Sequence, residues 1–168
     1  IISIIMNRIS SFAPIVSKDA KILILGSVPG VMSLEKQQYY GHPQNKFWQI
    51  MFDLFNEEFT TDYEARISLL IKNKIALWDT IESCERKGSL DSAIKNEENN
   101  KILELLETHP NISAIFCNGK KSFKNLEKIL NKKFPMPVFD MPSTSPAYAG
   151  MPFEKKLEEW RVILNYLD

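Results

Sequence analysis

The chain has 168 residues and a mass of 19.4 kDa, enough for one hydrophobic core and too few for two ordinary domains. Apolar residues make up 44% and charged residues 25%, which excludes a wholly disordered or collagen-like chain. Lysine plus arginine total 21 and aspartate plus glutamate total 21, and this zero sum alone disfavours a protein that coats nucleic acid. We expect a single domain over residues 1–168, with residues 1–5 a non-native or disordered extension ahead of Met6.

The sequence indicates neither a disulfide framework nor a metal site. Cys84 and Cys117 lie 33 positions apart without metal-ligand spacing around either, so a cytoplasmic location is expected. His42 and His109 are the only histidines, too few for a three-histidine metal site. The longest uncharged stretches, residues 22–34 among them, are only 13 residues long, and this one contains glycine and proline, so we expect no membrane span.

Four short apolar runs predict β-strands that are buried on both faces. These runs are Lys21–Gly26, Lys74–Thr80, Ala114–Gly119 and Pro137–Met141. Apolar residues at helical spacing predict helices over residues 45–56, from Asp62, over 99–108, over 120–133 and from Phe153. The alternation predicts an α/β fold, a three-layer α/β/α sandwich around a central four-stranded parallel sheet.

Ligands of open α/β sheets bind beyond the carboxyl ends of the strands. The segments of interest are therefore residues 26–45, 79–94, 118–121 and 142–150. The first of them opens with Gly26–Gly30 (GSVPG), which could cradle a phosphate. It lacks the GK[ST] ending of a P-loop and the third glycine of a dinucleotide site, so ATP and NAD are disfavoured. A noncatalytic module that binds a phosphorylated small molecule there is one hypothesis.

Two pairs of residues fit the S-x-x-K pattern of β-lactamase-type sites. Ser33 precedes Lys36 at this spacing, and Ser92 precedes Lys95. Since the companion motifs of such sites are missing, both matches are interpreted as chance.

Two further segments carry polar groups at loop positions. In YYGHPQNKFW (39–48), Asn45 is suited to cap a helix, and Phe47 and Trp48 are suited to the core. PSTSP (142–146) follows the fourth strand and predicts either an ordinary turn or a stiff loop whose hydroxyls hold phosphate oxygens.

In series, these segments resemble the uracil-DNA glycosylase superfamily, and within it the hypoxanthine-DNA (deoxyinosine) glycosylase family. The resemblance extends from about Phe12 to Trp160 and is carried by GSVPG, YYGHPQNKFW, LWDT, GSLDSAI, NG and MPSTSPA. It implies a monofunctional DNA repair enzyme that flips a deaminated base, hypoxanthine first, out of the duplex and hydrolyses its N-glycosidic bond. It implies no metal and no cofactor. We expect a monomer whose partner is damaged DNA.

The resemblance also implies roles for individual residues. Asn45 would position the attacking water, because Val28 stands where mismatch glycosylases have an asparagine. Tyr40 would stack on the flipped base, and Asp79 would read the base or, alternatively, cap the segment that follows it. Gly26, Ser27 and Val28 would place their backbone atoms close to the base. Contacts to DNA would come from Pro142, Ser143, Thr144, Ser145, Pro146 and Lys120.

Two positions depart from the pattern of the superfamily. Met141 stands where uracil-specific members have histidine, so backbone donors or another side chain must stabilise the leaving base, and uracil is a weaker candidate. Tyr148 stands where a small polar residue is expected and is a candidate wedge into the base stack. The alternatives are a uracil or mismatch glycosylase, and a lyase that forms a Schiff base through Lys36 or Lys46.

The zero net charge conceals an uneven distribution. Residues 118–133 hold six lysines against Glu127 alone, a net charge of +5, so the other residues sum to −5. We expect the first turn of this basic helix to face DNA and its later lysines to face solvent.

Overall fold

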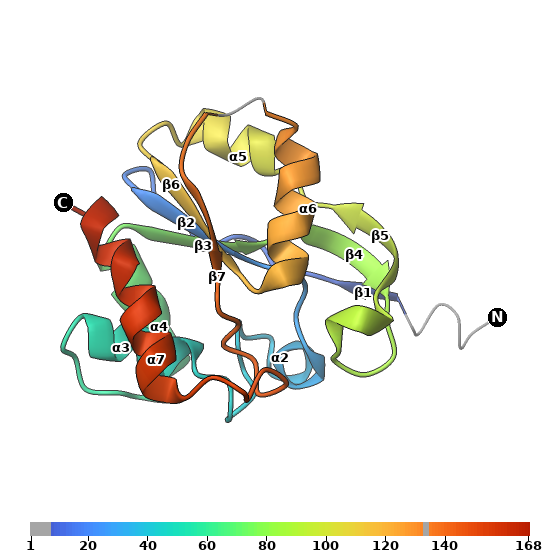
Figure 1. Ribbon diagram of the computed structural model, residues 1–168, viewed down its shortest axis with the longest axis horizontal. Helices are drawn as coiled ribbons and strands as arrows, with labels where there is room; N and C mark the ends of the chain where they lie inside the picture. Colours follow the sequence, from blue (N-terminus) through green and yellow to red (C-terminus); the bar gives the residue numbers. More distant parts are fainter. Residues whose placement is uncertain (1–7, 133–134) are drawn as a thin grey trace.

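A parallel sheet of four strands, in the order β3-β2-β6-β7, forms the centre of the computed structural model, which describes residues 8–132 and 135–168 (Figure 1). Each strand agrees with its prediction to within one residue at either end. The register places Gly26 beside Asp79 where two neighbouring strands end. The four strands are β2 (Ile22–Gly26), β3 (Ile75–Asp79), β6 (Ala114–Asn118) and β7 (Val138–Met141).

Helices cover both faces of this sheet, which confirms the three-layer α/β/α prediction (Figure 1). Because side chains alternate along a strand, Ile22 and Ile24 pack on one face, and Leu23 and Leu25 on the other. The first face carries α3 (Phe47–Leu54), α4 (Tyr63–Lys72), α7 (Phe153–Trp160) and the 3₁₀ helix η2 (Arg161–Tyr166). The second carries α5 (Ile102–Thr108) and α6 (Lys120–Leu130).

The sequence did not predict the second sheet, which is antiparallel and has the order β1-β4-β5. Its strands are β1 (Arg8–Ser10), β4 (Ile81–Glu85) and β5 (Lys95–Asn99). Every residue of β5 is exposed, so this edge strand has none of the apolar alternation that marks a half-buried strand. The helix predicted from residue 99 was wrong at its start, because Asn99 ends β5. The β4–β5 connection, with the 3₁₀ helix η1 (Asp91–Ala93), reaches toward the carboxyl edge of the parallel sheet.

Smaller differences concern helix ends. The six-residue helix α2 (Val31–Lys36) was not predicted, because it buries only one side chain, Ser33. Asp62 holds the N-cap position of α4 as expected, but its side chain makes no capping hydrogen bond. The extension expected at residues 1–5 lies outside the described residues. Within those residues, no helix has the length and apolarity that a bilayer crossing requires.

Candidate active site

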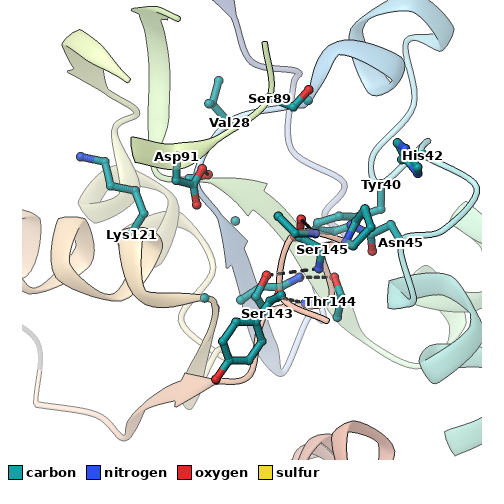
Figure 2. A pocket seen from close by; sticks show the side chains of 18 of the residues that line it. Val28, Tyr40, His42, Asn45, Ser89, Asp91, Lys121, Ser143, Thr144 and Ser145 are labelled. Atoms are coloured by element: carbon teal, nitrogen blue, oxygen red, sulfur yellow. Dashed lines mark hydrogen bonds between the residues drawn. The ribbon is translucent and has the colours of Figure 1, made fainter. Parts of the chain in front are cut away.

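A cavity of about 880 Å³ opens at the carboxyl ends of the parallel strands, within the size range of small-molecule sites. All four segments singled out from the sequence contribute to it. Figure 2 shows Tyr40 and Asn45 on one side of the cavity and Asp91 and Lys121 on the opposite side. The structure brings every predicted site residue to its lining: Gly26, Ser27, Val28, Tyr40, Asn45, Asp79, Lys120, Pro142, Ser143, Thr144, Ser145 and Pro146.

Three residues meet at the floor of this cavity. A Cβ atom on Gly26 would lie 2.6 Å from Asp79 Oδ1 and 2.8 Å from the hydroxyl oxygen of Tyr40. Real Cβ atoms do not approach other atoms so closely, so only glycine lets these two side chains converge on the end of β2. Here glycine is required for close approach and not for a special backbone conformation.

The floor holds polar atoms without partners. Asp79 is 4% exposed, and within the described residues neither its Oδ2 nor the buried hydroxyl of Tyr40 has a hydrogen-bond partner. Burial, and then the charge of Asp91, raise the pKa of Asp79 to about 7. Unpaired buried polar atoms are costly, so a ligand group that reached them and formed a hydrogen bond would be favoured.

The alternative that Asp79 caps the segment after β3 is wrong. A capping side chain accepts from the N–H two or three residues further on, here that of Ile81 or Glu82. The N–H of Ile81 donates instead to the carbonyl oxygen of Ser27 at 3.0 Å, and within the described residues Asp79 Oδ2 has no partner. The carboxyl group of Asp79 is therefore left to the cavity.

Tyr40 adopts a strained backbone conformation in a firmly held segment. Its φ is +52°, a left-handed value that costs a non-glycine residue on the order of 1 kcal/mol. Next to it, the N–H of Gly41 donates to Ser33 Oγ at 2.8 Å, and Lys36 Nζ donates to the Gly41 carbonyl at 2.9 Å. The S-x-x-K match of Ser33 and Lys36 therefore has a structural use.

The ring of Tyr40 is oriented by a stacked aromatic neighbour. It stacks on Phe47 with ring centroids 4.3 Å apart, and the side chain also lines the cavity. A flat ring supported from behind is suited to stack on a planar ligand.

Asn45 lies one residue before the N-cap of α3, which is Lys46, so the prediction that Asn45 caps this helix is wrong by one residue; its side chain lines the cavity. Its Oδ1 accepts a hydrogen bond from the backbone N–H of Phe47 at 2.9 Å, which fixes the side chain and identifies the amide oxygen. The amide oxygen has a second lone pair, and the amide nitrogen has two hydrogens, for a molecule in the cavity. The turn before α3 therefore holds the Asn45 side chain in place and still leaves these groups to the cavity.

The PSTSP loop is anchored by Thr144, whose side chain is 1% exposed. Its hydroxyl accepts a hydrogen bond from Asn118 Nδ2 at 2.9 Å, so this side chain holds the loop in place. Ser143 Oγ accepts from the N–H of Ser145, and Ser145 Oγ accepts from the N–H of Ala147, both at 3.1 Å. Each serine hydroxyl can still donate its own hydrogen to an anion.

Helix α7 holds both ends of the same loop. Trp160 Nε1 donates to the carbonyl of Pro142 at 3.0 Å, and Lys156 Nζ donates to the carbonyl of Tyr148 at 2.7 Å. The candidate wedge Tyr148 keeps 49% of its surface exposed and lines the cavity. The backbone of Tyr148 is therefore held in place at the rim of the cavity.

The start of the basic helix α6 faces the cavity. Lys120 and Lys121 of the first turn line it, and so does Lys124 of the second turn, a later lysine that was expected to face solvent. Lys120 forms an ion pair with Asp140, which raises the pKa of its ammonium group, and Lys121 pairs with Glu97 at 2.7 Å. Lys36 and Lys46, the candidates for a Schiff base, are not among the described residues that line the cavity.

Val28 uses its side chain for packing. It is 9% exposed and contacts a small apolar cluster with Ile81 and Cys84 of β4, while it also borders the cavity. It therefore ties the GSVPG loop to the second sheet and offers no side-chain polar group to the site.

Sequence reasoning missed several residues of the lining. Among them are His42, whose Nδ1 accepts from the N–H of Gln44 at 3.1 Å, and the pair Ser89 and Asp91. Ser89 and Asp91 belong to GSLDSAI, a motif that was noticed without a role for any of its residues. Their place in the site depends on the β4–β5 connection, which carried no apolar signal. Across the described ranges, no group of three or more His, Cys, Asp or Glu residues could hold a metal ion.

Comparisons with known proteins identify the family. Residues 13–168 match the uracil DNA glycosylase superfamily. The chain is 42% identical over 112 residues to a protein of Methanosarcina barkeri named hypoxanthine DNA glycosylase, an alignment of 66% of this chain and 71% of that protein. It is 34% identical over 157 residues to a protein of the same name from Methanosarcina acetivorans, covering 92% and 97% of the two chains.

A solved structure agrees with this assignment. The solution NMR structure of a Methanosarcina acetivorans protein, whose description suggests a uracil DNA glycosylase, superposes with a TM-score of 0.81. It is 32% identical, and the match covers 95% of this chain and 98% of that one. The chain therefore belongs to the uracil DNA glycosylase superfamily.

Proposed function

We propose that the chain hydrolyses the N-glycosidic bond of hypoxanthine in DNA and leaves the strand intact. As a member of its superfamily the chain is a DNA glycosylase, and both curated relatives carry the name hypoxanthine DNA glycosylase. The observation that carries the proposal is the convergence of Asn45, Tyr40 and Asp79 on a single cavity beside Gly26. These groups match the three tasks of the reaction: holding the base, receiving it as it leaves and placing a water.

The base must leave the duplex to reach these groups. Asp79 and the hydroxyl of Tyr40 lie at the floor of the cavity, which a stacked base pair cannot enter. Flipping a nucleotide out costs a few kcal/mol, and the cost is smallest for a mispaired base such as hypoxanthine. The supported ring of Tyr40 would receive the flipped base by stacking.

Asn45 would hold the attacking water. An amide is too weak a base to deprotonate water, but the sugar becomes cationic as the base departs, and an oriented water then suffices. The hydrogen bond from Phe47 fixes Asn45 Oδ1, so its second lone pair has a set direction. Water supplies the hydroxyl group to C1′ and a proton to the departing base, while the electron pair of the glycosidic bond leaves with the base.

Asp79 would supply the donor that the missing motif histidine cannot. With a pKa raised to about 7, its carboxyl group is largely protonated at slightly acidic pH and can donate a hydrogen bond to the departing base. Met141, in the place of the histidine, has no such hydrogen. A neutral carboxyl group also has an acceptor oxygen, so it matches a base edge that presents one N–H and one carbonyl group.

The strand around the flipped nucleotide would be held by few contacts. Ser143 and Ser145 have hydroxyl hydrogens to donate to phosphate oxygens, and Lys120 lies at the rim, where it can exchange Asp140 for phosphate. Because few lysines are involved, we expect the affinity for DNA to depend less on salt than that of a lysine-rich coat protein.

A panel of duplexes that each carry one lesion tests the proposal. Purified protein is incubated with duplexes containing inosine, xanthosine, uracil or a G·T mismatch, and the released bases are separated by chromatography. We expect free hypoxanthine from the inosine duplex, with the strand intact until alkali is added. Release of uracil or thymine alone would favour the alternative specificity, and a borohydride-trapped covalent adduct would favour a lyase. Nucleotide binding with no base released would favour the noncatalytic phosphate-binding module.

A further inference from the structure

One carboxylate of the cavity has no part in the proposed chemistry. Asp91 lies on the wall opposite Tyr40 and Asn45 (Figure 2). Its Oδ1 accepts a hydrogen bond from Ser27 Oγ at 2.7 Å. Asp91 is exposed, and the structure records no ion pair for it within the described residues.

The connection that carries Asp91 is fixed to the GSVPG loop at several points. Arg86, which is 6% exposed, donates from Nη2 to the carbonyl of Pro29 at 2.8 Å and from Nε to the carbonyl of Gly88 at 2.6 Å. The backbone N–H of Val31 donates to Ser89 Oγ at 2.9 Å. Together with the Ser27 bond, these contacts give the carboxylate of Asp91 a fixed place on the cavity wall although it is exposed to solvent.

The negative charge of Asp91 influences two acidic groups at the floor of the cavity. Its charge is the second cause, after burial, of the raised pKa of Asp79, and it also contributes to the raised pKa of Tyr40. Two acidic side chains therefore influence the floor of the cavity: Asp79, which is buried, and Asp91, which is exposed.

A carboxylate at this place would oppose DNA binding unless it met a positive charge. Phosphates surround any flipped nucleotide and repel a carboxylate. The other acidic side chains of the lining are differently placed: Asp79 is buried, Asp140 pairs with Lys120, and Glu159 projects from α7. Within the protein, the charge of Asp91 interacts with the buried guanidinium group of Arg86, and the reaction provides a further positive charge, because the sugar becomes oxocarbenium-like when the base departs.

We propose that Asp91, held by Ser27, is a second catalytic carboxylate whose charge stabilises the cationic sugar in the transition state. This inference rests on the proposed function. Asp91 forms no covalent bond and takes no proton: C1′ and its ring oxygen share the developing positive charge, and water from the Asn45 side completes the substitution at C1′. Protonated Asp79 would then donate a hydrogen bond to the departing base, and charged Asp91 would stabilise the cationic sugar.

Asp91→Asn tests the charge separately from the hydrogen bond. Its Oδ1 can still accept from Ser27, so the connection keeps its anchor while the charge is removed. We expect the single-turnover rate of hypoxanthine release to fall by about 10-fold to 100-fold, the usual scale for removing one preorganised electrostatic group. The affinity for product duplex containing an abasic site should stay the same or improve, because a repulsive charge has gone. Asp91→Glu, which restores the charge, should recover part of the rate.

Glu159→Gln is the matched control, because it removes one negative charge from the same cavity lining without touching the proposed machinery. It should release hypoxanthine at the wild-type rate, and thermal melting should show all variants folded. A wild-type rate in Asp91→Asn, or an equal loss in Glu159→Gln, would overturn the role of Asp91 alone. Failure of the wild-type protein to release any base would instead overturn the proposed function and this inference with it.

Discussion

Asn118 and Thr144 form two hydrogen bonds to each other at the edge of the cavity. Asn118 Nδ2 donates to Thr144 Oγ1 at 2.9 Å, and the backbone N–H of Thr144 donates to Asn118 Oδ1 at 3.0 Å. The carbonyl of Thr144 also accepts from the N–H of Lys46 at 3.0 Å. The end of β6, the loop after β7 and the start of α3 are therefore joined at one residue, so the position of the PSTSP loop relative to Asn45 is fixed.

Thr144→Val should destabilise the protein, because it keeps the shape of the side chain and leaves Asn118 Nδ2 without its acceptor. We expect the free energy of unfolding in urea to fall by about 1 to 3 kcal/mol, with a smaller rate of base release. Ser143→Ala is the comparison, since among the described residues the Ser143 hydroxyl bonds only within its own turn, and this variant should change stability by less than about 1 kcal/mol. Equal stability of Thr144→Val and wild type would show that the pair does not hold the loop.

Gly26→Ala should disrupt the floor of the cavity. The new Cβ would meet Asp79 Oδ1 and the Tyr40 hydroxyl at 2.6 and 2.8 Å, and one of these side chains must move. We expect a loss of base release of at least about 10-fold, since small misplacements of reacting groups are costly. Gly150→Ala is the control, because a Cβ there meets no atom within 4 Å. The close packing of the floor would be irrelevant to function if both variants released hypoxanthine at one rate.

The pH dependence of the free energy of unfolding should report the protonation of Asp79. Its pKa is about 7 in the folded protein and near 3.8 when unfolded, so between these values the folded chain holds a proton that the unfolded chain has lost. The contribution of this residue to the free energy of unfolding therefore falls as pH rises from about 4 to about 7, by up to the order of 4 kcal/mol.

Asp79→Asn should remove this pH dependence. The difference in free energy of unfolding between wild type and variant, measured in urea, should therefore change from about pH 4 to about pH 7, to the disadvantage of the wild type as pH rises. Hypoxanthine release by the wild type should also decline above about pH 7, as the carboxyl group loses its proton, whereas release by Asp79→Asn should not show that decline. Parallel pH profiles for the two proteins would contradict the assignment of a proton to Asp79.

Tyr148→Ala should slow base release from a duplex substrate more than from a single-stranded one. A wedge at the cavity rim is needed only where a base must be removed from a stack. We expect the rate on an inosine duplex to fall several-fold while the rate on single-stranded inosine DNA stays within about two-fold of wild type. An equal loss on both substrates would assign Tyr148 to the cavity and not to the duplex.

The sequence predicted the parallel sheet well because its strands are buried runs of apolar residues, as Ile22–Gly26 illustrates. It predicted the members of the site because GSVPG, YYGHPQNKFW and MPSTSPA carry the resemblance to a known family. It did not predict the second sheet, since β5 (KNEEN) is exposed throughout and its pairing with β4 is a tertiary property. Asp91 was missed for the same reason: a hydrogen bond between residues 27 and 91 leaves no local pattern.

Asn45→Ser separates the proposed placing of water by Asn45 from the hydrogen bond that this residue accepts from Phe47. Serine can still accept from the N–H of Phe47 and so keep the turn before α3, but it cannot present an amide oxygen to the cavity. The measurement is single-turnover release of hypoxanthine from an inosine duplex, together with the affinity for the abasic product. The account predicts wild-type binding and stability with a rate at least about 100-fold lower. Release at the wild-type rate by a folded Asn45→Ser protein would contradict it.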